Sequence, residues 1–264
     1  MEPDKGDHIL ETVGLTRVFG GVRAVDNLDF YVNQGEIVSL IGPNGAGKTT
    51  VFNVVSGIYP PTAGRILFKG KNIAGLKPDR VERQGISRTF QTLRLFANMT
   101  VLENVLVGFH ARLRSNLFGD VVQPPWVAKR EREAVDEARK LLGMLSPRLV
   151  AQQEFRSADL AYADRRLLEL ARAMASQPDL LMLDEPTAGM NPTEAMQFME
   201  KIRQIHAEGF TILLIEHNLS VVMGVSQRIT VLDYGTKISE GTPTQVRSDE
   251  RVIEAYLGRK AVTA

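Results

Sequence analysis

The sequence predicts an α/β protein in which a helical segment interrupts a core of alternating strands and helices. Short runs at 36–41, 180–183 and 211–215 are apolar on both faces, as is typical of buried parallel strands. A glycine-rich loop at 42–49 separates the first run from a helical stretch. From about 91 to 176 the periodicity is helical instead. We therefore expect an α/β core with an inserted helical subdomain.

The first 90 residues are predicted to form mainly strands. In one of them Leu28, Phe30 and Val32 recur at the strand period of two. Residues 1–7 are polar and are expected to lack regular structure, and Tyr59-Pro60-Pro61 is expected to break the chain direction. The predicted elements are strands at 9–18, 22–32 and 36–41, a helix at 48–56, and a hairpin region at 64–69 and 72–73.

The rest of the chain returns to β/α alternation after a helical middle. From 127 to 145 the spacing predicts an amphipathic helix, whose apolar stripe fits either a subdomain core or a partner surface. A later helix, ended by Gly209, is expected to bury a face formed by Met196, Met199, Ile202 and Ile205. The other predicted elements are a helix at 100–113, an irregular stretch at 115–126, a helix at 164–175, strands at 180–183 and 211–215, and a hairpin at 228–240 that turns at Tyr234-Gly235.

Composition excludes several classes of function. The chain has 264 residues, with 32 Lys and Arg against 31 Asp and Glu, a formal net charge of +1, and no cysteine. This charge gives no support to nucleic-acid binding through bulk electrostatics. The absence of cysteine excludes disulfide scaffolds, thiolate metal sites and cysteine nucleophiles. No apolar run reaches the roughly 18 residues of a membrane span, and the polar N-terminus is unlike a secretory signal, so we expect an intracellular protein.

The glycine-rich loop matches the pattern G-x-x-x-x-G-K-[ST] of phosphate-binding loops. Glycines let the backbone wrap a phosphate closely, and the helix that begins near Lys48 adds the positive end of its dipole. Lys48 is expected to reach the β- and γ-phosphates, and Thr49 to ligate Mg²⁺. The loop alone leaves both ATP and GTP open. The candidate nucleotide-binding residues are Gly42, Pro43, Asn44, Gly45, Ala46, Gly47, Lys48, Thr49 and Thr50.

Two further strand ends carry polar residues. The second buried strand runs into Asp184 and Glu185. In a phosphate-loop protein the first acid holds Mg²⁺, and an adjacent second acid is free to polarise the attacking water. Two neighbours in an extended chain point to opposite sides, which predicts separate roles; the alternative is a polar strand end before a proline turn. After the third strand, His217 is either a γ-phosphate sensor or a structural histidine, and Glu216 is a candidate surface residue.

The order of these motifs resembles that of the ATP-binding subunits of ABC transporters, over essentially the whole chain. Phe19 falls where this family places an aromatic residue that stacks on adenine, with an ordinary core aromatic as the alternative. The resemblance assigns the Walker A loop to 42–49, the Q-loop glutamine to Gln91, the Walker B acids to Asp184 and Glu185, the D-loop to 188–191, and the switch histidine to His217.

The resemblance also implies the chemistry of the site. ATP would be the nucleotide and Mg²⁺ the metal ion, held by Thr49, Gln91 and Asp184. Glu185 would be the catalytic base. The implied catalytic set is Glu185, His217, Lys48 and Gln91.

The signature stretch departs from the family pattern Leu-Ser-Gly-Gly-Gln, because the serine and both glycines are missing. Backbone donors and the helix dipole survive this change. Tyr162 adds bulk near the phosphate, and Ala163 would strain the loop if its position needs a positive φ. In the D-loop, Asn191 stands where an aspartate is usual. The signature residues of this chain are Leu160, Ala161, Tyr162, Ala163 and Asp164.

These departures, together with the ending at 255–258, resemble the branched-chain (hydrophobic) amino acid uptake family, and the longer of its two ATPase subunits most closely. The implied fold is a P-loop NTPase (RecA-like) core with an N-terminal antiparallel β subdomain and an inserted helical subdomain. Residues 1–264 would be one ABC ATPase domain, with the core at 1–90 and 177–264 and the helical signature subdomain at 91–176. Urea and amide importers of the same branch are the alternative.

The resemblance implies several protein partners. A second ATPase subunit, a shorter sister, would pair head to tail with this chain, and a homodimer of the isolated chain stays open. Two membrane permease subunits would anchor the pair at the cytoplasmic face of the inner membrane, and a periplasmic binding protein would deliver the substrate. No nucleic acid is implied.

Two other classes of protein fit these motifs less well. Non-transport ABC ATPases usually carry two ATPase domains, long coiled coils or strongly basic tracts, and this chain has none of them. A P-loop kinase or GTPase leaves Gln91, the stretch 160–164 and His217 unexplained.

Overall fold

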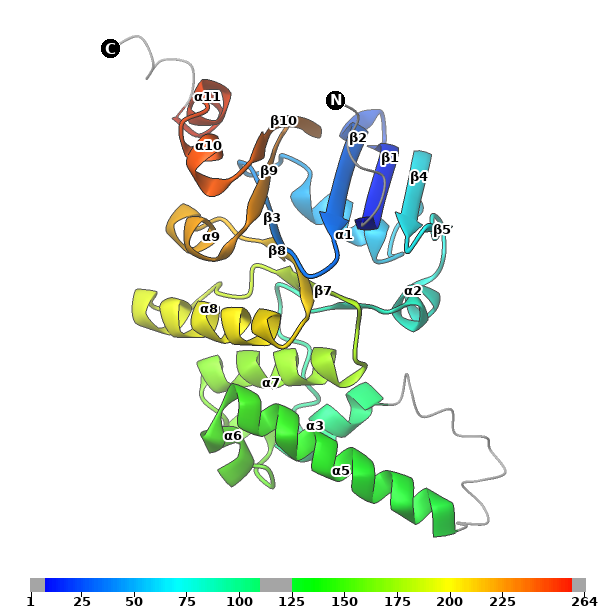
Figure 1. The fold of residues 1–264 in the computed structure, drawn as a ribbon, viewed down its shortest axis with the longest axis vertical. Coiled ribbons are helices and arrows are strands. Elements are labelled where there is room, and N and C mark those ends of the chain that lie inside the picture. The colour runs from blue at the N-terminus through cyan, green and yellow to red at the C-terminus, as the bar shows by residue number, and fades with distance from the viewer. Residues whose placement is uncertain (1–7, 110–124, 258–264) are drawn as a thin grey trace.

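Two β-sheets organise the chain in the computed structural model, which describes residues 8–109 and 125–257 (Figure 1). Expectations for residues 1–7, 110–113 and 115–124 lie outside this part. A sheet of four antiparallel strands carries the N-terminal residues, and a sheet of six strands, mostly parallel, forms the centre. Helices cover the central sheet, which confirms the predicted α/β class.

The antiparallel sheet has the strand order β2-β1-β4-β5. Leu28, Phe30 and Val32 on β2 are buried, as their period of two predicts. The predicted hairpin region is the antiparallel pair of β4 and β5. The strands are β1 (His8–Phe19), β2 (Val22–Asn33), β4 (Ala63–Phe68) and β5 (Lys71–Asn72).

The central sheet has the strand order β10-β9-β3-β8-β7-β6. All neighbouring pairs are parallel except that of β10 with β9, which is the predicted hairpin. The strands are β3 (Ile37–Ile41), β6 (Ile86–Arg88), β7 (Leu180–Asp184), β8 (Thr211–Ile215), β9 (Arg228–Asp233) and β10 (Thr236–Gly241).

Strand β7 contributes side chains to two hydrophobic cores, one on each face of the central sheet. On β7, Leu181 and Leu183 pack with the cluster formed by the helical layer. Leu180 and Met182 on the same strand pack with the cluster that includes α1 and the antiparallel sheet. Successive strand side chains point to opposite faces, so a run that is apolar throughout is needed to fill both cores.

Four helices, α3, α5, α6 and α7, gather at the end of the molecule away from β1 and β2 (Figure 1). The C-terminal helices α10 and α11 lie at the opposite end, near β10. The helices are α1 (Lys48–Val55), α2 (Pro78–Gln84), α3 (Val101–Gly108), α5 (Pro125–Leu145), α6 (Pro147–Ala151), the 3₁₀ turn η2 (Ser157–Asp159), α7 (Tyr162–Ala175), α8 (Pro192–Ala207), α9 (Leu219–Val225), α10 (Pro243–Arg247) and α11 (Glu250–Leu257).

The amphipathic helix α5 buries its apolar stripe inside the helical layer. Ala134, Ala138, Leu142 and Leu145 are buried, and the charged residues between them are mostly exposed. The stripe is therefore a subdomain core, one of the two alternatives that the sequence left open. The helix begins at Pro125, so residues 125 and 126 are helical and not irregular as expected. Proline suits a helix start, because its missing N–H would be unpaired there anyway.

The buried face of α8 is shifted by one residue from the predicted one. Met196 is 72% exposed, so its assignment to the core face is wrong. The helical spacing of the buried residues instead starts at Ala195, so Phe198 also lies on the buried face. The buried residues of this helix are Ala195, Phe198, Met199, Ile202 and Ile205.

In the described ranges, no helix combines the length and the apolar character that crossing a membrane requires.

Truncating Leu142 tests the core of the helical layer. Leu142 is fully buried, so Leu142→Ala is expected to lower the free energy of unfolding by about 2–5 kcal/mol, because it leaves a cavity. The measurement is urea denaturation followed by circular dichroism. Lys140→Ala, at an exposed position of the same helix, is the control and should stay within about 0.5 kcal/mol. Equal losses for the two variants would contradict this packing.

Candidate functional site

The carboxyl ends of three neighbouring strands bring the phosphate loop and two acidic strand ends together. Strand β8 lies between β3 and β7, and all three are parallel. They end at Ile41, Asp184 and Ile215. Because parallel strands share one carboxyl edge, the loops that follow them meet there, which is the usual ligand position of such sheets.

Two positions of the phosphate loop require glycine. Gly42 has a φ of +151° and Gly47 a φ of +99°. A Cβ at Gly42 would lie 2.1 Å from the carbonyl oxygen of Leu232, and one at Gly47 would lie 2.3 Å from that of Ala24. Helix α1 then begins at Lys48 without a side-chain cap, so the N–H groups of its first turn are available to an anion.

The Lys48 side chain folds over the loop that precedes it. It is only 7% exposed, and its Nζ donates to the carbonyl oxygens of Gly42, at 2.7 Å, and Pro43, at 3.0 Å. Burial lowers the pKa of Lys48, while the charges of Glu185 and Asp184 raise it. The ammonium group therefore lies in the field of both acids at the strand edge.

Asp184 and Glu185 face different partners because the backbone turns between them. Oδ2 of Asp184 accepts a hydrogen bond of 2.6 Å from Nη2 of Arg88, in an ion pair that is almost fully buried. Glu185 has a φ of +47°, so the expectation of an extended chain here is wrong. Its N–H donates to the carbonyl oxygen of Ile215 at 2.9 Å. Its Oε2 accepts a hydrogen bond of 2.9 Å from Nε2 of Gln91.

The residues that follow β8 complete this edge. Glu216 is fully buried, so its interpretation as a surface residue is wrong. Its Oε1 accepts hydrogen bonds from the N–H, at 2.9 Å, and the hydroxyl of Thr187. Nδ1 of His217 lies 3.8 Å from Oε2 of both Glu185 and Glu216, and 59% of the His217 side chain is exposed. His217 thus stands beside Glu185 and is open to a ligand.

A buried arginine on α7 holds the backbone at Gln91. Arg166 is 4% exposed and donates to the carbonyl oxygens of Phe90, at 3.1 Å, and Gln91, at 2.6 Å. It also pairs with Glu169 at 3.3 Å. Burial raises the pKa of Glu169, and the N–H of Arg94 and the charge of Arg166 lower it. Sequence reasoning missed this pair, because charged residues on a helix usually face solvent.

Tyr162 joins the signature stretch to the D-loop of its own chain. Its hydroxyl donates to the carbonyl oxygen of Ala188 at 2.8 Å and accepts a hydrogen bond of 2.9 Å from Nη2 of Arg166. Ala163 is not among the residues with a positive φ, so the expected strain is absent. The tyrosine that departs from the family pattern is thus bonded on both sides.

The rest of the signature stretch forms the start of α7. Leu160 is buried, and Ala161 is the N-cap residue, with no side-chain hydrogen bond. Asp164 lies in the first turn, where the helix dipole favours its negative charge. The N–H groups at this helix start have no side-chain cap, as in α1.

Asn191 in the D-loop caps a helix. Its Oδ1 accepts a hydrogen bond of 3.0 Å from the N–H of Glu194, and the Glu194 carboxylate accepts one of 3.0 Å from the N–H of Asn191. Asparagine and aspartate are equally good N-cap residues. The substitution therefore preserves the start of α8.

Phe19 lies in an aromatic group at the end of β1. Its side chain is 37% exposed, so the alternative of an ordinary core aromatic is wrong. The ring of Tyr59 meets it edge-on, with centroids 5.3 Å apart, and the guanidinium of Arg17 lies 4.4 Å from the Phe19 centroid. Sequence reasoning missed the contact with Tyr59, because Tyr59 lies far from Phe19 in the chain.

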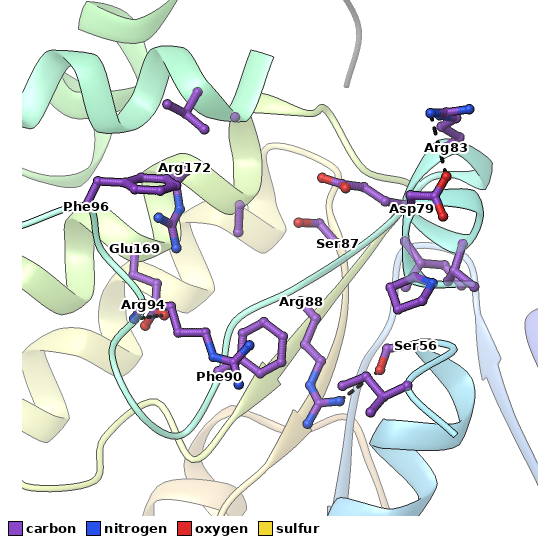
Figure 2. Close-up of a pocket in the computed structure, with 18 residues that line it drawn as sticks. Ser56, Asp79, Arg83, Ser87, Arg88, Phe90, Arg94, Phe96, Glu169 and Arg172 are labelled. Carbon is purple, nitrogen blue, oxygen red and sulfur yellow. Dashed lines mark hydrogen bonds and ion pairs between the residues drawn. The ribbon is translucent and has the colours of Figure 1, made fainter. Parts of the chain in front are cut away.

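A pocket of about 480 Å³ opens beside Phe90, the residue before Gln91, between α2 and β6 on one side and α3 and α7 on the other. Figure 2 shows the arginines and aromatic rings that line it. The guanidinium of Arg94 lies 3.9 Å from the centroid of Phe90, and that of Arg172 lies 5.6 Å from the centroid of Phe96. We call this the Q-loop pocket, since its wall leads into Gln91.

A second hollow, of about 670 Å³, lies beside the turn of the phosphate loop. The turn between β9 and β10 and helix α11 form its other walls, through Tyr234, Arg251 and Glu254. We call it the C-terminal hollow.

The predicted metal ligands offer the oxygen donors that Mg²⁺ prefers. Thr49 is exposed in the first turn of α1, Asp184 supplies a carboxylate, and Gln91 keeps its amide oxygen because the bond to Glu185 uses Nε2. Across 8–109 and 125–257, no three His, Cys, Asp or Glu residues form a metal-binding group. This donor set fits Mg²⁺, which is usually bound by one or two carboxylates together with substrate phosphates.

Two family models match the chain. Residues 25–188 match the model described as ABC transporter. Residues 236–262 match the model described as branched-chain amino acid ATP-binding cassette transporter. The first match includes the phosphate loop, Gln91, the signature stretch and the acids Asp184 and Glu185.

Curated relatives are similar over almost their whole length. The high-affinity branched-chain amino acid transport ATP-binding protein LivG of Escherichia coli (strain K12) is 46% identical, with 95% of this chain and 98% of the relative covered. The protein BraF of Pseudomonas aeruginosa, with the same description, is 43% identical at the same coverage.

Solved structures agree in fold. A nucleotide-free ATP-binding cassette from an ABC transporter has a TM-score of 0.81 at 33% identity and covers 96% of this chain and 100% of its own. An ATP-binding cassette in its ADP conformation has a TM-score of 0.82 at 34% identity, and the match covers 96% of this chain and 99% of that one.

Two substitutions at Asn191 test its role as a cap. Asn191→Ala is expected to lower the free energy of unfolding by about 1 kcal/mol, because the N–H of Glu194 loses its acceptor. Asn191→Asp keeps the acceptor and is expected to stay within about 0.5 kcal/mol of the parent chain. Urea denaturation of both variants measures the difference. Equal stability of the two would show that the cap contributes nothing.

Proposed function

The chain belongs to the ABC transporter ATP-binding family, in its branched-chain amino acid branch, and from this premise we propose that it powers import of branched-chain amino acids by hydrolysing ATP at the carboxyl edge of its central sheet. The observation that carries the proposal is the position of Glu185. Its carboxylate is bonded to Gln91 and lies 3.8 Å from His217. Glu185 follows β7, and His217 follows the neighbouring strand β8. The names of the relatives favour branched-chain amino acids over urea or amides.

The phosphate loop supplies the binding energy for the nucleotide. The N–H groups of the loop and of the first turn of α1 would bind the phosphates, and Lys48 would exchange its bonds with Gly42 and Pro43 for bonds to the β- and γ-phosphates. Phe19 would stack on adenine with its exposed ring. Bound Mg²⁺, held by Thr49, Asp184 and Gln91, would neutralise developing negative charge.

Glu185 acts as the base in this mechanism. A carboxylate that turns away from the metal ligand Asp184 is free to accept a proton from the attacking water. His217, whose side chain is exposed beside Glu185, would hydrogen-bond the γ-phosphate. Gln91 orients Glu185 through the bond from Nε2. A change in the position of Gln91 would therefore change the orientation of the base.

We further propose that two cassettes pair head to tail. The stretch Leu160–Asp164 of one chain would then face the nucleotide held by the phosphate loop of the other. The uncapped start of α7 supports this arrangement, because its N–H groups can bind a γ-phosphate. In the transporter the partner would be a shorter sister subunit, and the isolated chain would form a homodimer.

The Q-loop pocket is proposed as the docking site for a permease subunit. Its arginines and aromatic rings suit a loop with acidic and apolar residues. In this proposal residues 91–176 move as a helical subdomain, and Arg166 transmits the movement to Gln91 through two hydrogen bonds. Two permease subunits would hold the pair at the cytoplasmic face of the inner membrane, and a periplasmic binding protein would deliver the amino acid.

Neutralising Glu185 tests the base. Glu185→Gln should lower the steady-state rate of ATP hydrolysis by about 100-fold or more, because proton acceptance is lost. ATP affinity, measured by calorimetry, should stay within about threefold. Glu131→Gln, at an exposed position of α5, is the matched control and should hydrolyse ATP at the parent rate. Hydrolysis by Glu185→Gln at the parent rate would remove Glu185 as the base.

Placing a charge in the Q-loop pocket tests the docking site. Phe96 is 49% exposed at the pocket wall, so Phe96→Asp should leave ATP binding by the isolated chain unchanged. With co-expressed permease subunits, it should reduce the amount of this chain that purifies with membranes. Ile253→Asp, at an exposed site on α11, is the control. Unchanged association of Phe96→Asp would place the docking site elsewhere.

A further inference from the structure

One side chain connects the Q-loop pocket with Asp184, and it belongs to Arg88, at the end of the short strand β6. Nη2 of Arg88 donates to Oδ2 of Asp184 at 2.6 Å. Nη1 donates to Oδ1 of Asn53 and to Oγ of Ser56, both at 2.8 Å, on the helix that follows the phosphate loop. A single guanidinium therefore joins three elements of the nucleotide site: β6, β7 and α1.

The ion pair is buried on both sides. The side chain of Arg88 is 6% exposed and that of Asp184 is 3% exposed. The guanidinium lies 4.9 Å from the ring centroid of Phe90 and 5.4 Å from that of Phe52. Burial lowers the pKa of Arg88, and Asp184 raises it. Such a pair has a fixed geometry, because little water is present to compete for either charge.

The other arginines of the pocket make different contacts. Among the described residues that line it, Arg83 pairs with Asp79 at the surface, and Arg94 and Arg172 lie over aromatic rings. Figure 2 shows Arg88 extending along the pocket toward Ser56, beside Phe90. Arg88 is thus the pocket arginine bonded to an acid of the nucleotide site.

We propose that Arg88 is a positioning residue that fixes the orientation of Asp184 and links it to the wall of the Q-loop pocket. The inference rests on the proposed role of Asp184 as the Mg²⁺ carboxylate. Because Oδ2 accepts the hydrogen bond from Arg88, the direction in which the carboxylate faces a bound ion would depend on that bond. Arg88 is three residues before Gln91, so a partner that shifts this segment moves the support of Asp184 together with Gln91.

The planar fork of arginine is needed for this role. It reaches Asp184 from one nitrogen while the other bonds Asn53 and Ser56. A lysine carries the same charge on a single nitrogen and cannot hold the same three groups in that geometry. Arg88→Lys therefore keeps the buried charge balanced and removes the fixed orientation.

The experiment measures the binding of Mn²⁺, as a paramagnetic substitute for Mg²⁺, to the full chain with saturating ATP. Arg88→Lys should weaken Mn²⁺ binding by about 10-fold or more, as is typical when a residue that orients a metal ligand is replaced. ATP affinity in the presence of a chelator should stay within about twofold of the parent value. Arg83→Lys, in the same pocket but without contact to Asp184, should leave both values unchanged.

A second variant keeps the test valid if Arg88→Lys fails to fold. Asn53→Ala leaves Arg88 in place and removes one of its two bonds to α1, so it should weaken Mn²⁺ binding by roughly two- to tenfold. Parent Mn²⁺ affinity in a folded Arg88→Lys, or in Asn53→Ala if the lysine variant is unfolded, would overturn the proposal. An equally large loss of ATP affinity in the presence of the chelator would also overturn it, because Arg88 would then support the whole fold of the site.

Asp184→Asn separates this inference from the proposed function. Loss of Mn²⁺ binding in Asp184→Asn together with parent binding in Arg88→Lys would overturn the role of Arg88 alone. Parent Mn²⁺ binding in Asp184→Asn would remove Asp184 as the metal carboxylate, and both proposals would fail.

Discussion

The parallel register of β3, β8 and β7 is the constraint on which the site depends. Ile215 on the middle strand β8 pairs with Leu40 of β3 on one side and with Asp184 of β7 on the other. The residues that follow these positions must therefore emerge side by side at one edge. The N–H of Glu185 donates to the carbonyl oxygen of Ile215, so the hydrogen-bond ladder continues one residue past β7, into the proposed catalytic base. A slip of one residue in this register would turn the acids toward the opposite face.

Burial of charge at this edge explains the hydrogen bonds that join the surrounding elements. Asp184, Glu216 and Lys48 are each nearly inaccessible to solvent, and an unpaired buried charge is costly. Each one therefore has a hydrogen-bond partner in this structure: a guanidinium for Asp184, the Thr187 loop for Glu216, and loop carbonyls for Lys48. These partners belong to different elements, so satisfying the charges also ties the elements together. The same bonds that stabilise the site give it routes by which movement elsewhere can reach it.

Hydrogen bonds of Arg166 and Tyr162 connect the helical layer to the loops at this edge. Arg166 holds the backbone of Gln91 and also bonds Tyr162, whose hydroxyl reaches the D-loop. The signature stretch, the Q-loop and the D-loop of one chain are therefore joined by the hydrogen bonds of Arg166 and Tyr162. Tyr162 replaces the small residues of the family pattern and gives this chain a bond between signature and D-loop that a glycine could not form.

The sequence predicted the parts of the fold that follow from local patterns. Buried strands, the phosphate loop and the amphipathic α5 were visible because periodicity and glycine spacing are local properties. The strand β6 has three residues, too few for a period, and its partner β7 lies far along the chain. Arg88, Arg166 and Glu216 were missed for the same reason, because a charged residue reveals its burial only through distant partners. The positive φ of Glu185 was missed too, since non-glycine residues rarely adopt it.

Hydrogen exchange of the Glu185→Gln chain with and without Mg²⁺ and ATP tests most directly whether the sheet edge is one nucleotide site. If the edge is one site, ATP slows amide exchange together at 42–50, 89–92, 184–188 and 216–218. Residues 243–257, which contribute Arg251, Glu254 and Ala255 to the wall of the C-terminal hollow, should exchange at an unchanged rate. Protection confined to the phosphate loop, or centred on that hollow, would contradict the account.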